Sequence, residues 1–136
     1  MRIWIIGMYV LLLLSVGCSS LSDSNQTSKN YVIKCLDGDT CLVMWNGYEE
    51  KLRIKDLDSP EINGKCKEES RKGLEAKHYL NHRIKTAKDI QIEVVSNDRY
   101  YRLIGDIYID GNSVLGIMTY HQHGVRWTGK KKDWCK

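Results

Sequence analysis

The sequence contains no phenylalanine and only one proline among its 136 residues. The core therefore has to be built from Ile, Leu, Val, Tyr and Trp. Such a composition excludes collagen-like and proline-rich low-complexity chains. No motif recurs at a period of about 20–50 residues, which argues against a solenoid. Neither charge dominates, since 21 Lys and Arg oppose 17 Asp and Glu, and 42% of the residues are hydrophobic. A single folded domain with a short appendage is the expectation.

The N-terminal apolar segment is too short to span a membrane. Residues 3–14 follow Arg2 and are almost all apolar, but a transmembrane helix needs about 20 such residues. This pattern predicts a signal peptide over residues 1–17. The sequence LSVGCSS resembles a bacterial lipoprotein signal, although Ser15 stands where an aliphatic residue is usual. We expect export, with Cys18 lipidated and the protein anchored to a membrane of the cell envelope. A simply cleaved peptide, which gives a periplasmic or secreted protein, and an uncleaved anchor are the alternatives.

Residues 19–30 are polar and carry no periodic apolar signal. We therefore predict a flexible tether over residues 18–30 and a folded domain over residues 31–136.

Four cysteines remain in the predicted domain, an even number that suits an oxidising compartment. They allow three pairings. We favour Cys35–Cys41 and Cys66–Cys135, because the first two flank a tight turn. Zinc held by four thiolates is the alternative, which the absence of a CxxC pair disfavours. His78 and His82, one helical turn apart, offer only two ligands to zinc.

The hydrophobic pattern predicts five short strands and two helices. The strands cover residues 31–36, 40–46, 49–54, 90–95 and 102–109. Asn46-Gly47 and Asp110-Gly111 supply turn signals. The helices cover residues 68–87 and 113–123, and Gly124 is expected to cap the second. This order predicts an α+β, mainly β fold, a five-stranded OB-fold barrel with two helices.

Acidic residues concentrate in one part of a basic chain. Seven acids and three basic residues lie between Asp37 and Glu61. Asp37 and Asp39 bracket a glycine, and Asp58 and Glu61 bracket Ser59-Pro60. Two such turns can gather the carboxylate oxygens that Ca²⁺ requires. Ordinary variation of surface charge is the alternative.

Arg53 and Arg102 add cations near these acids in the sequence or in the predicted sheet. A guanidinium binds phosphate oxygens with paired hydrogen bonds. Carboxylates that hold a divalent metal, together with two arginines, would suit phosphodiester cleavage. Surface ion pairs are the alternative for each arginine.

An ordered series of motifs resembles the staphylococcal-nuclease-like, or thermonuclease, family. The series is DGDT (37–40), LRIKDLDSPE (52–61), GLEA (73–76), DRYYR (98–102) and IYIDG (107–111). The tail GKKKDWC (129–135) is similar to the end of small exported members, which supports the Cys66–Cys135 pairing.

The resemblance implies an OB-fold barrel and a Ca²⁺-dependent nuclease that hydrolyses DNA and RNA and leaves 3′-phosphate ends. The implied metal ligands are Asp39, Asp58 and the backbone carbonyl of Ser59, with Thr40 near the metal. The implied catalytic residues are Arg53, Glu61 and Arg102. Glu61 aligns with the glutamate that positions or activates water, and the arginines align with those that bind phosphate.

One position departs from the family pattern. Tyr101 stands where the family has glycine, and a positive φ there would strain the turn and redirect Arg102. A non-catalytic OB-fold module that binds nucleic acid is therefore the alternative function. A structural envelope lipoprotein with no nucleic-acid role is a third, which the acids and arginines disfavour. We expect a monomer.

Overall fold

A computed structural model describes residues 29–136 of the protein. The predicted signal peptide, Cys18 and the tether as far as residue 28 lie outside the described residues. The first strand begins at Tyr31, where the polar tether was expected to end. Within residues 29–136, none of the helices has the length and apolar character needed to cross a membrane.

The main sheet contains the five predicted strands and one short addition. Its strands are β1 (Tyr31–Cys35), β2 (Thr40–Trp45), β3 (Tyr48–Ile54), β5 (Ile90–Asn97), β6 (Leu103–Ile109) and β7 (Asn112–Ser113). Two hairpin turns were predicted correctly. Asn46 and Gly47 have φ of 49° and 87°, and Asp110 and Gly111 have φ of 50° and 83°, as two-residue hairpin loops require.

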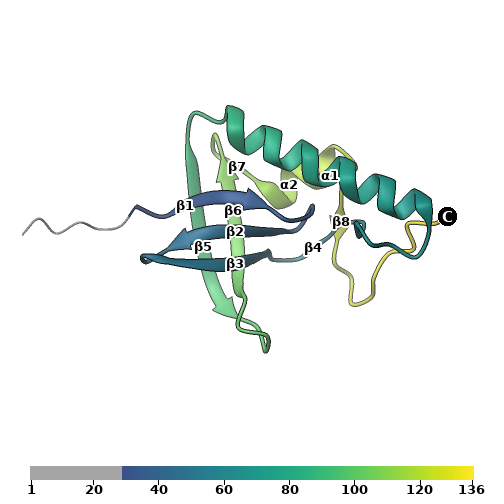
Figure 1. Ribbon diagram of the computed structural model, residues 1–136, viewed down its shortest axis with the longest axis horizontal. Coiled ribbons are helices and arrows are strands. Elements are labelled where there is room, and N and C mark those ends of the chain that lie inside the picture. The colour runs from purple at the N-terminus through teal and green to yellow at the C-terminus, as the bar shows by residue number, and fades with distance from the viewer. Residues whose placement is uncertain (1–28) are drawn as a thin grey trace, which may run out of the picture.

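The strand order β1-β2-β3-β6-β5 places sequence-distant strands side by side. Antiparallel pairing joins all neighbours except β3 and β6, which are parallel, with Leu52 opposite Leu103. In Figure 1 the strands β1 to β3 cross the pair β5 and β6 at a steep angle. The α+β, OB-fold-like architecture is confirmed, but the predicted barrel is not closed. The hydrogen-bonded order ends at β1 and β5, so the closing ladder of a full barrel is missing between them.

The two helices cover the sheet from one side (Figure 1). Helix α1 (Lys67–Thr86) buries Ala76 and Leu80, and the shorter α2 (Val114–Tyr120) buries Val114, Ile117 and Met118. Strand β6 alternates between buried and half-buried residues, as a strand with one face on the core does. These elements form one core, to which β2 and β3 add Val43, Leu52 and Ile54.

A second, two-stranded sheet was not predicted. It pairs β4 (Leu57–Asp58) with β8 (Val125–Arg126). The prediction that Gly124 caps α2 is wrong, because the helix ends at Tyr120 and its C-cap is His121. Gly124 instead lets the chain pass close to β4, since a Cβ there would lie 2.6 Å from Leu57 Cδ1 and 3.2 Å from the Asp58 carbonyl oxygen.

The structure contains two disulfides, Cys35–Cys41 and Cys66–Cys135. Both have the pairing expected from the sequence, so these four cysteines are not zinc ligands. The first bridges the turn between β1 and β2. The second spans 69 residues and ties the C-terminal tail to the start of α1.

Truncation of Leu80 should test the contact between α1 and the sheet. Leu80 is fully buried, so Leu80→Ala should lower the free energy of unfolding by about 2–5 kcal/mol. Leu74 lies on the same helix with 42% exposure, and Leu74→Ala should change it by less than about 1 kcal/mol. Urea denaturation measures both. Equal losses for the two variants would contradict this packing of α1.

Candidate active site

The turn between β1 and β2 is organised by the side chain of Asp37. Its Oδ1 accepts hydrogen bonds from the backbone N–H of Asp39 at 2.9 Å and of Thr40 at 2.8 Å. An aspartate that bonds the backbone two residues onward forms its own turn. The N–H of Leu36 donates to the carbonyl of Thr40 at 2.8 Å and closes the loop. The turn thereby fixes the backbone at Asp39, directly before β2 begins.

Asp39 connects three segments of the chain. Its side chain is almost fully buried. Its Oδ2 atom accepts a hydrogen bond from the backbone N–H of Ser59 at 3.2 Å and lies 3.4 Å from Nη2 of Arg53. Its Oδ1 atom accepts a hydrogen bond from the Thr40 hydroxyl at 3.1 Å. The structure thus brings together four of the predicted site residues, Asp39, Thr40, Arg53 and Ser59. A buried carboxylate needs such partners, because its ionised form is costly to remove from water.

Asp58 and Glu61 flank Ser59 and differ in exposure. Asp58 ends β4 and is buried, and its Oδ2 accepts the backbone N–H of Lys132 at 2.7 Å. Glu61 has a half-exposed side chain that pairs with Lys131. Both lysines belong to the C-terminal tail. Asp58 is therefore shielded like Asp39, whereas Glu61 faces solvent.

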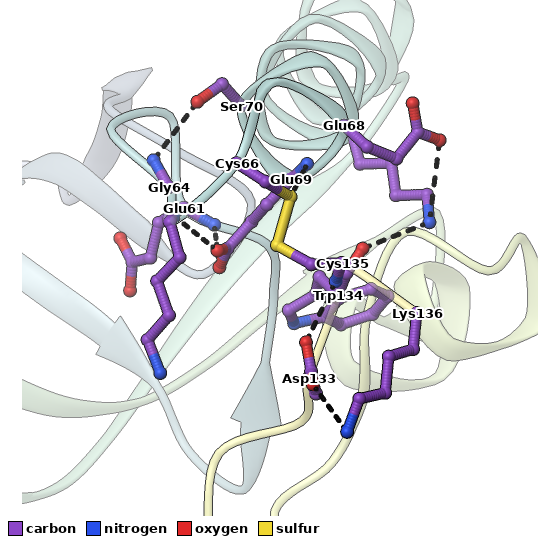
Figure 2. Close-up of a disulfide and its surroundings, with 12 residues drawn as sticks. Glu61, Gly64, Cys66, Glu68, Glu69, Ser70, Asp133, Trp134, Cys135 and Lys136 are labelled. Carbon is purple, nitrogen blue, oxygen red and sulfur yellow. Dashed lines mark hydrogen bonds and ion pairs between the residues drawn. A yellow bond between two sulfur atoms is a disulfide. The ribbon is translucent and has the colours of Figure 1, made fainter.

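The backbone around Glu61 is held by Glu69, a residue that our sequence analysis did not identify. The Glu69 carboxylate is buried in the first turn of α1 and accepts the N–H of Glu61 at 3.3 Å and of Lys65 at 2.8 Å. Figure 2 shows this carboxylate beside the Glu61–Gly64 turn. An acidic residue near a helix N-terminus is common, so no sequence pattern indicated this role. Glu69 thereby positions the predicted catalytic glutamate through its main chain.

Two glycines let α1 approach these loops closely. A Cβ on Gly38 would lie 2.9 Å from Cβ of both Ala76 and Ser59. A Cβ on Gly73 would lie 2.6 Å from the carbonyl carbon of Glu61. Real Cβ atoms do not reach such distances without displacement of their neighbours. The absence of side chains at these positions therefore brings the two acidic turns together beneath the helix.

The carboxyl groups of this site act on one another. Burial, which is the largest cause, and the charges of Asp39 and Glu61 together raise the pKa of Asp37 to about 6, against the backbone hydrogen bond that it accepts from Asp39. The three carboxyls consequently lie within one another's electric field. Excess negative charge of this kind is typical of sites that bind a cation.

Arg53 and Arg102 project from the same side of the sheet. Arg53 is opposite Ile104 in the β3–β6 pairing, and Arg102 lies two residues before Ile104, so their side chains share the face away from the core. Arg53 donates from Nη1 to the Ile54 carbonyl at 2.7 Å. Arg102 pairs with Asp98 at 2.7 Å. Of these two arginines, only Arg53 forms an ion pair with one of the predicted metal-binding acids, Asp39, in the described structure.

Tyr101 adopts the left-handed backbone conformation that the family glycine suggested. Its φ is 61°, and its side chain is 89% exposed. The N–H of Tyr101 donates to the carbonyl of Asp98 at 3.1 Å, and the Asp98 side chain accepts the N–H groups of Tyr100 and Arg102. The turn thus forms with tyrosine at this position, and the same aspartate holds the Arg102 side chain.

The residues predicted to hold a metal offer oxygen atoms. Asp39 and Asp58 carry carboxylates, and Ser59, whose N–H donates to Asp39, has a backbone carbonyl. Hard oxygen donors suit Ca²⁺, so the donor set fits this ion in kind. Among residues 29–136, no three His, Cys, Asp or Glu side chains form a ready-made metal cluster. His78 and His82 are both exposed.

Comparison with protein families identifies the domain. The model of the family described as staphylococcal nuclease homologue matches residues 51–131, more than half of the chain. The chain belongs to this staphylococcal nuclease homologue family. The matched span includes Arg53, Asp58, Ser59, Glu61 and Arg102. Asp39 and Thr40 precede it, and the structure joins them to it through the bonds from Asp39 to Ser59 and Arg53.

The raised pKa of Asp37 predicts a pH-dependent gain of stability in Asp37→Asn. Between about pH 4 and pH 6 the folded nuclease homologue binds more protons at Asp37 than the unfolded chain does, so its free energy of unfolding falls as pH rises. At pH 7.5 in chelator, Asp37→Asn should raise this free energy by about 1–3 kcal/mol. The asparagine Oδ1 can still accept both backbone bonds.

Denaturation at pH 7.5 and pH 4 measures this effect, which should vanish at the lower pH. Asp56→Asn provides a matched control, because Asp56 is exposed and asparagine tolerates its φ of 58°. A gain of the same size at both pH values, or in both variants, would show that ionisation of Asp37 is not its cause.

Replacement of Tyr101 by glycine should stabilise the β5–β6 turn of this family member. A left-handed conformation costs an L-residue about 1–2 kcal/mol, and glycine avoids this cost but loses more entropy on folding. Tyr101→Gly should therefore raise the free energy of unfolding by up to about 1 kcal/mol. Tyr100→Gly, one residue earlier, should lower it. Urea denaturation measures the free energy of unfolding of both variants. A lower value for Tyr101→Gly than for the unchanged protein would refute backbone strain at this residue.

Proposed function

We propose that the protein is a Ca²⁺-dependent nuclease that hydrolyses phosphodiester bonds of DNA and RNA and leaves 3′-phosphate ends. The observation that carries this proposal is the contact of Arg53 with the buried carboxylate of Asp39, which is itself bonded to the Asp58–Glu61 segment. This contact, in a domain of a nuclease-type family, supports a role for Arg53 in binding phosphate and for the acids in binding metal.

The buried oxygens would hold the metal. Asp39 and Asp58 would bind Ca²⁺ through their carboxylates and Ser59 through its carbonyl, with Thr40 supporting Asp39 by its hydroxyl. The bound ion would polarise a phosphoryl oxygen and offset the charge of these acids.

Glu61 is suited to act on water. Its side chain is half-exposed, so the carboxylate can reach solvent. Its main chain is held in place by the hydrogen bond to Glu69. In the proposed reaction Glu61 positions or deprotonates a water molecule. The hydroxide oxygen bonds to phosphorus, the bond to the 5′-oxygen breaks, and that oxygen takes up a proton. The phosphate remains on the 3′-oxygen.

The arginines are suited to stabilise the phosphate. Arg53 has one guanidinium nitrogen 3.4 Å from Asp39 and would bind a non-bridging oxygen, where negative charge grows during attack. Arg102 would act similarly after leaving Asp98. Tyr100 and Tyr101 are exposed beside it, where they could stack on unpaired bases.

The alternative is a non-catalytic OB-fold module that binds nucleic acid. The ion pair between Arg102 and Asp98, next to the strained Tyr101, favours it. If this pair persists with substrate, only one arginine serves the phosphate. Such a module would bind oligonucleotides with a strong salt dependence and without a metal requirement.

We further propose that the protein is exported and acts at the cell envelope. The signal-like residues 1–17 and Cys18 support a lipid-anchored form, and the two disulfides suit an oxidising compartment. A monomer with DNA and RNA as its substrates is the simplest arrangement.

Digestion of single-stranded DNA tests the proposed activity. The oxidised full chain, held in mild detergent, should cleave with millimolar Ca²⁺ and not with chelator. Glu61→Ala and Arg53→Ala should each lower the rate by about 10²-fold or more. End-group analysis should find 3′-phosphates.

Lys51→Ala serves as the control for Arg53→Ala, because Lys51 is an exposed basic residue on the same strand. It should retain most of the activity. A folded, oxidised protein that leaves DNA intact in Ca²⁺ would refute the nuclease. Binding of the same DNA without cleavage would then support the alternative module.

A further inference from the structure

The C-terminal tail, residues 127–136, lies along the segment that carries Asp58 and Glu61. The N–H of Trp127 donates to the Asp56 carbonyl at 2.8 Å. Further along, the N–H of Lys132 donates to the Asp58 carboxylate at 2.7 Å, and Lys131 pairs with Glu61. The tail therefore contacts both Asp58 and Glu61.

The end of the tail is fixed covalently. Figure 2 shows the disulfide that joins Cys135 to Cys66 at the start of α1, next to Glu69 and the Glu61–Gly64 turn. Trp134 is buried, and its carbonyl accepts a hydrogen bond from Lys72 at 3.3 Å. The backbone at Lys131 thus lies between the β8 strand and the disulfide, while its side chain is 40% exposed.

The four lysines of the tail differ in what their side chains do. Lys136 pairs with Asp133 at 3.2 Å. The Lys132 ammonium lies 4.4 Å from the centre of the Trp134 ring. Lys130 is exposed. Lys131 alone pairs with a residue proposed for catalysis, and both partners are accessible, with side-chain exposures of 40% and 50%. An ion pair this exposed contributes at most about 1 kcal/mol, so a phosphate can compete for the lysine.

We propose that Lys131 is a substrate-binding residue that contacts a phosphate of the nucleic acid at the active site, and that the Cys66–Cys135 disulfide positions it there. The proposal rests on the proposed function, because it assigns the substrate to the same site. When nucleic acid binds, the ammonium moves from Glu61 to a phosphate oxygen. This exchange releases the Glu61 carboxylate and adds a cation from the tail to the arginines of the sheet.

Binding in chelator tests the proposal separately from cleavage. A fluorescent single-stranded oligonucleotide is titrated with the oxidised full chain between 50 and 200 mM salt. Lys131→Ala should weaken binding by about tenfold at low salt and reduce the slope of log K against log salt by about 0.7. Lys131→Arg should restore both. The matched control, Lys130→Ala, should change each by less than half as much.

The disulfide provides a second arm. The double variant Cys66→Ser, Cys135→Ser should weaken binding to a similar extent. Lys131→Ala should weaken it little further in that background, because the disulfide and the lysine are proposed to serve the same contact and their effects are then not additive. Circular dichroism and thermal melting establish that each variant is folded. If the double variant unfolds, the single lysine variants still test whether Lys131 binds the nucleic acid.

Three results would overturn the proposal. Equal effects at Lys130 and Lys131 would mean a diffuse basic tail. No effect at Lys131 would leave it an ordinary surface residue. Faster cleavage by Lys131→Ala with unchanged binding would make the tail an inhibitor of Glu61. A wild-type protein that binds with the predicted lysine dependence but does not cleave would refute the nuclease and leave the lysine assignment standing.

Discussion

The close approach of α1 to two acidic turns is the constraint on which the site depends. Gly38 and Gly73 leave no room for a Cβ, with the nearest atoms at 2.9 and 2.6 Å from where it would be. Because the helix lies this close, Glu69 in its first turn reaches the main chain of Glu61, and Ser59 comes within hydrogen-bonding distance of Asp39. A helix displaced by one side-chain layer would separate the carboxylates. The fold therefore uses helix packing, and not the turns alone, to assemble the site.

Bringing these acids together is electrostatically unfavourable for the folded protein. The pKa of Asp37 rises to about 6 because burial and the neighbouring acids disfavour its charge. At the two buried acids Asp39 and Asp58, Arg53 and the backbone N–H groups of Ser59 and Lys132 offset part of the cost of burying charge. The cation of the proposed function would relieve this repulsion and thereby stabilise the folded chain.

Local patterns predicted most elements of the fold, whereas long-range contacts escaped them. Alternating apolar residues marked β5 and β6, and Asn46-Gly47 marked a hairpin, because both signals act between near neighbours. The β4–β8 pair was missed because each strand has two residues and its partner is far away in the chain. Barrel closure was overestimated for a similar reason, since strand count does not determine whether the edges pair. In the site, motif order indicated the acids and arginines, but the contact of Glu69 with the main chain of Glu61 is one that no local pattern encodes.

The tail extends the same principle to the edge of the domain. A chain of this size has little core to hold ten terminal residues, and Trp134 is the buried residue among them. The Cys66–Cys135 bridge closes a loop of 69 residues and limits the freedom that the unfolded tail would regain. It joins the tail to the same helical turn that holds Glu61 through Glu69. Helix, acidic turn and tail therefore form one connected unit, in which a change in the tail reaches the candidate site through covalent and hydrogen-bonded contacts.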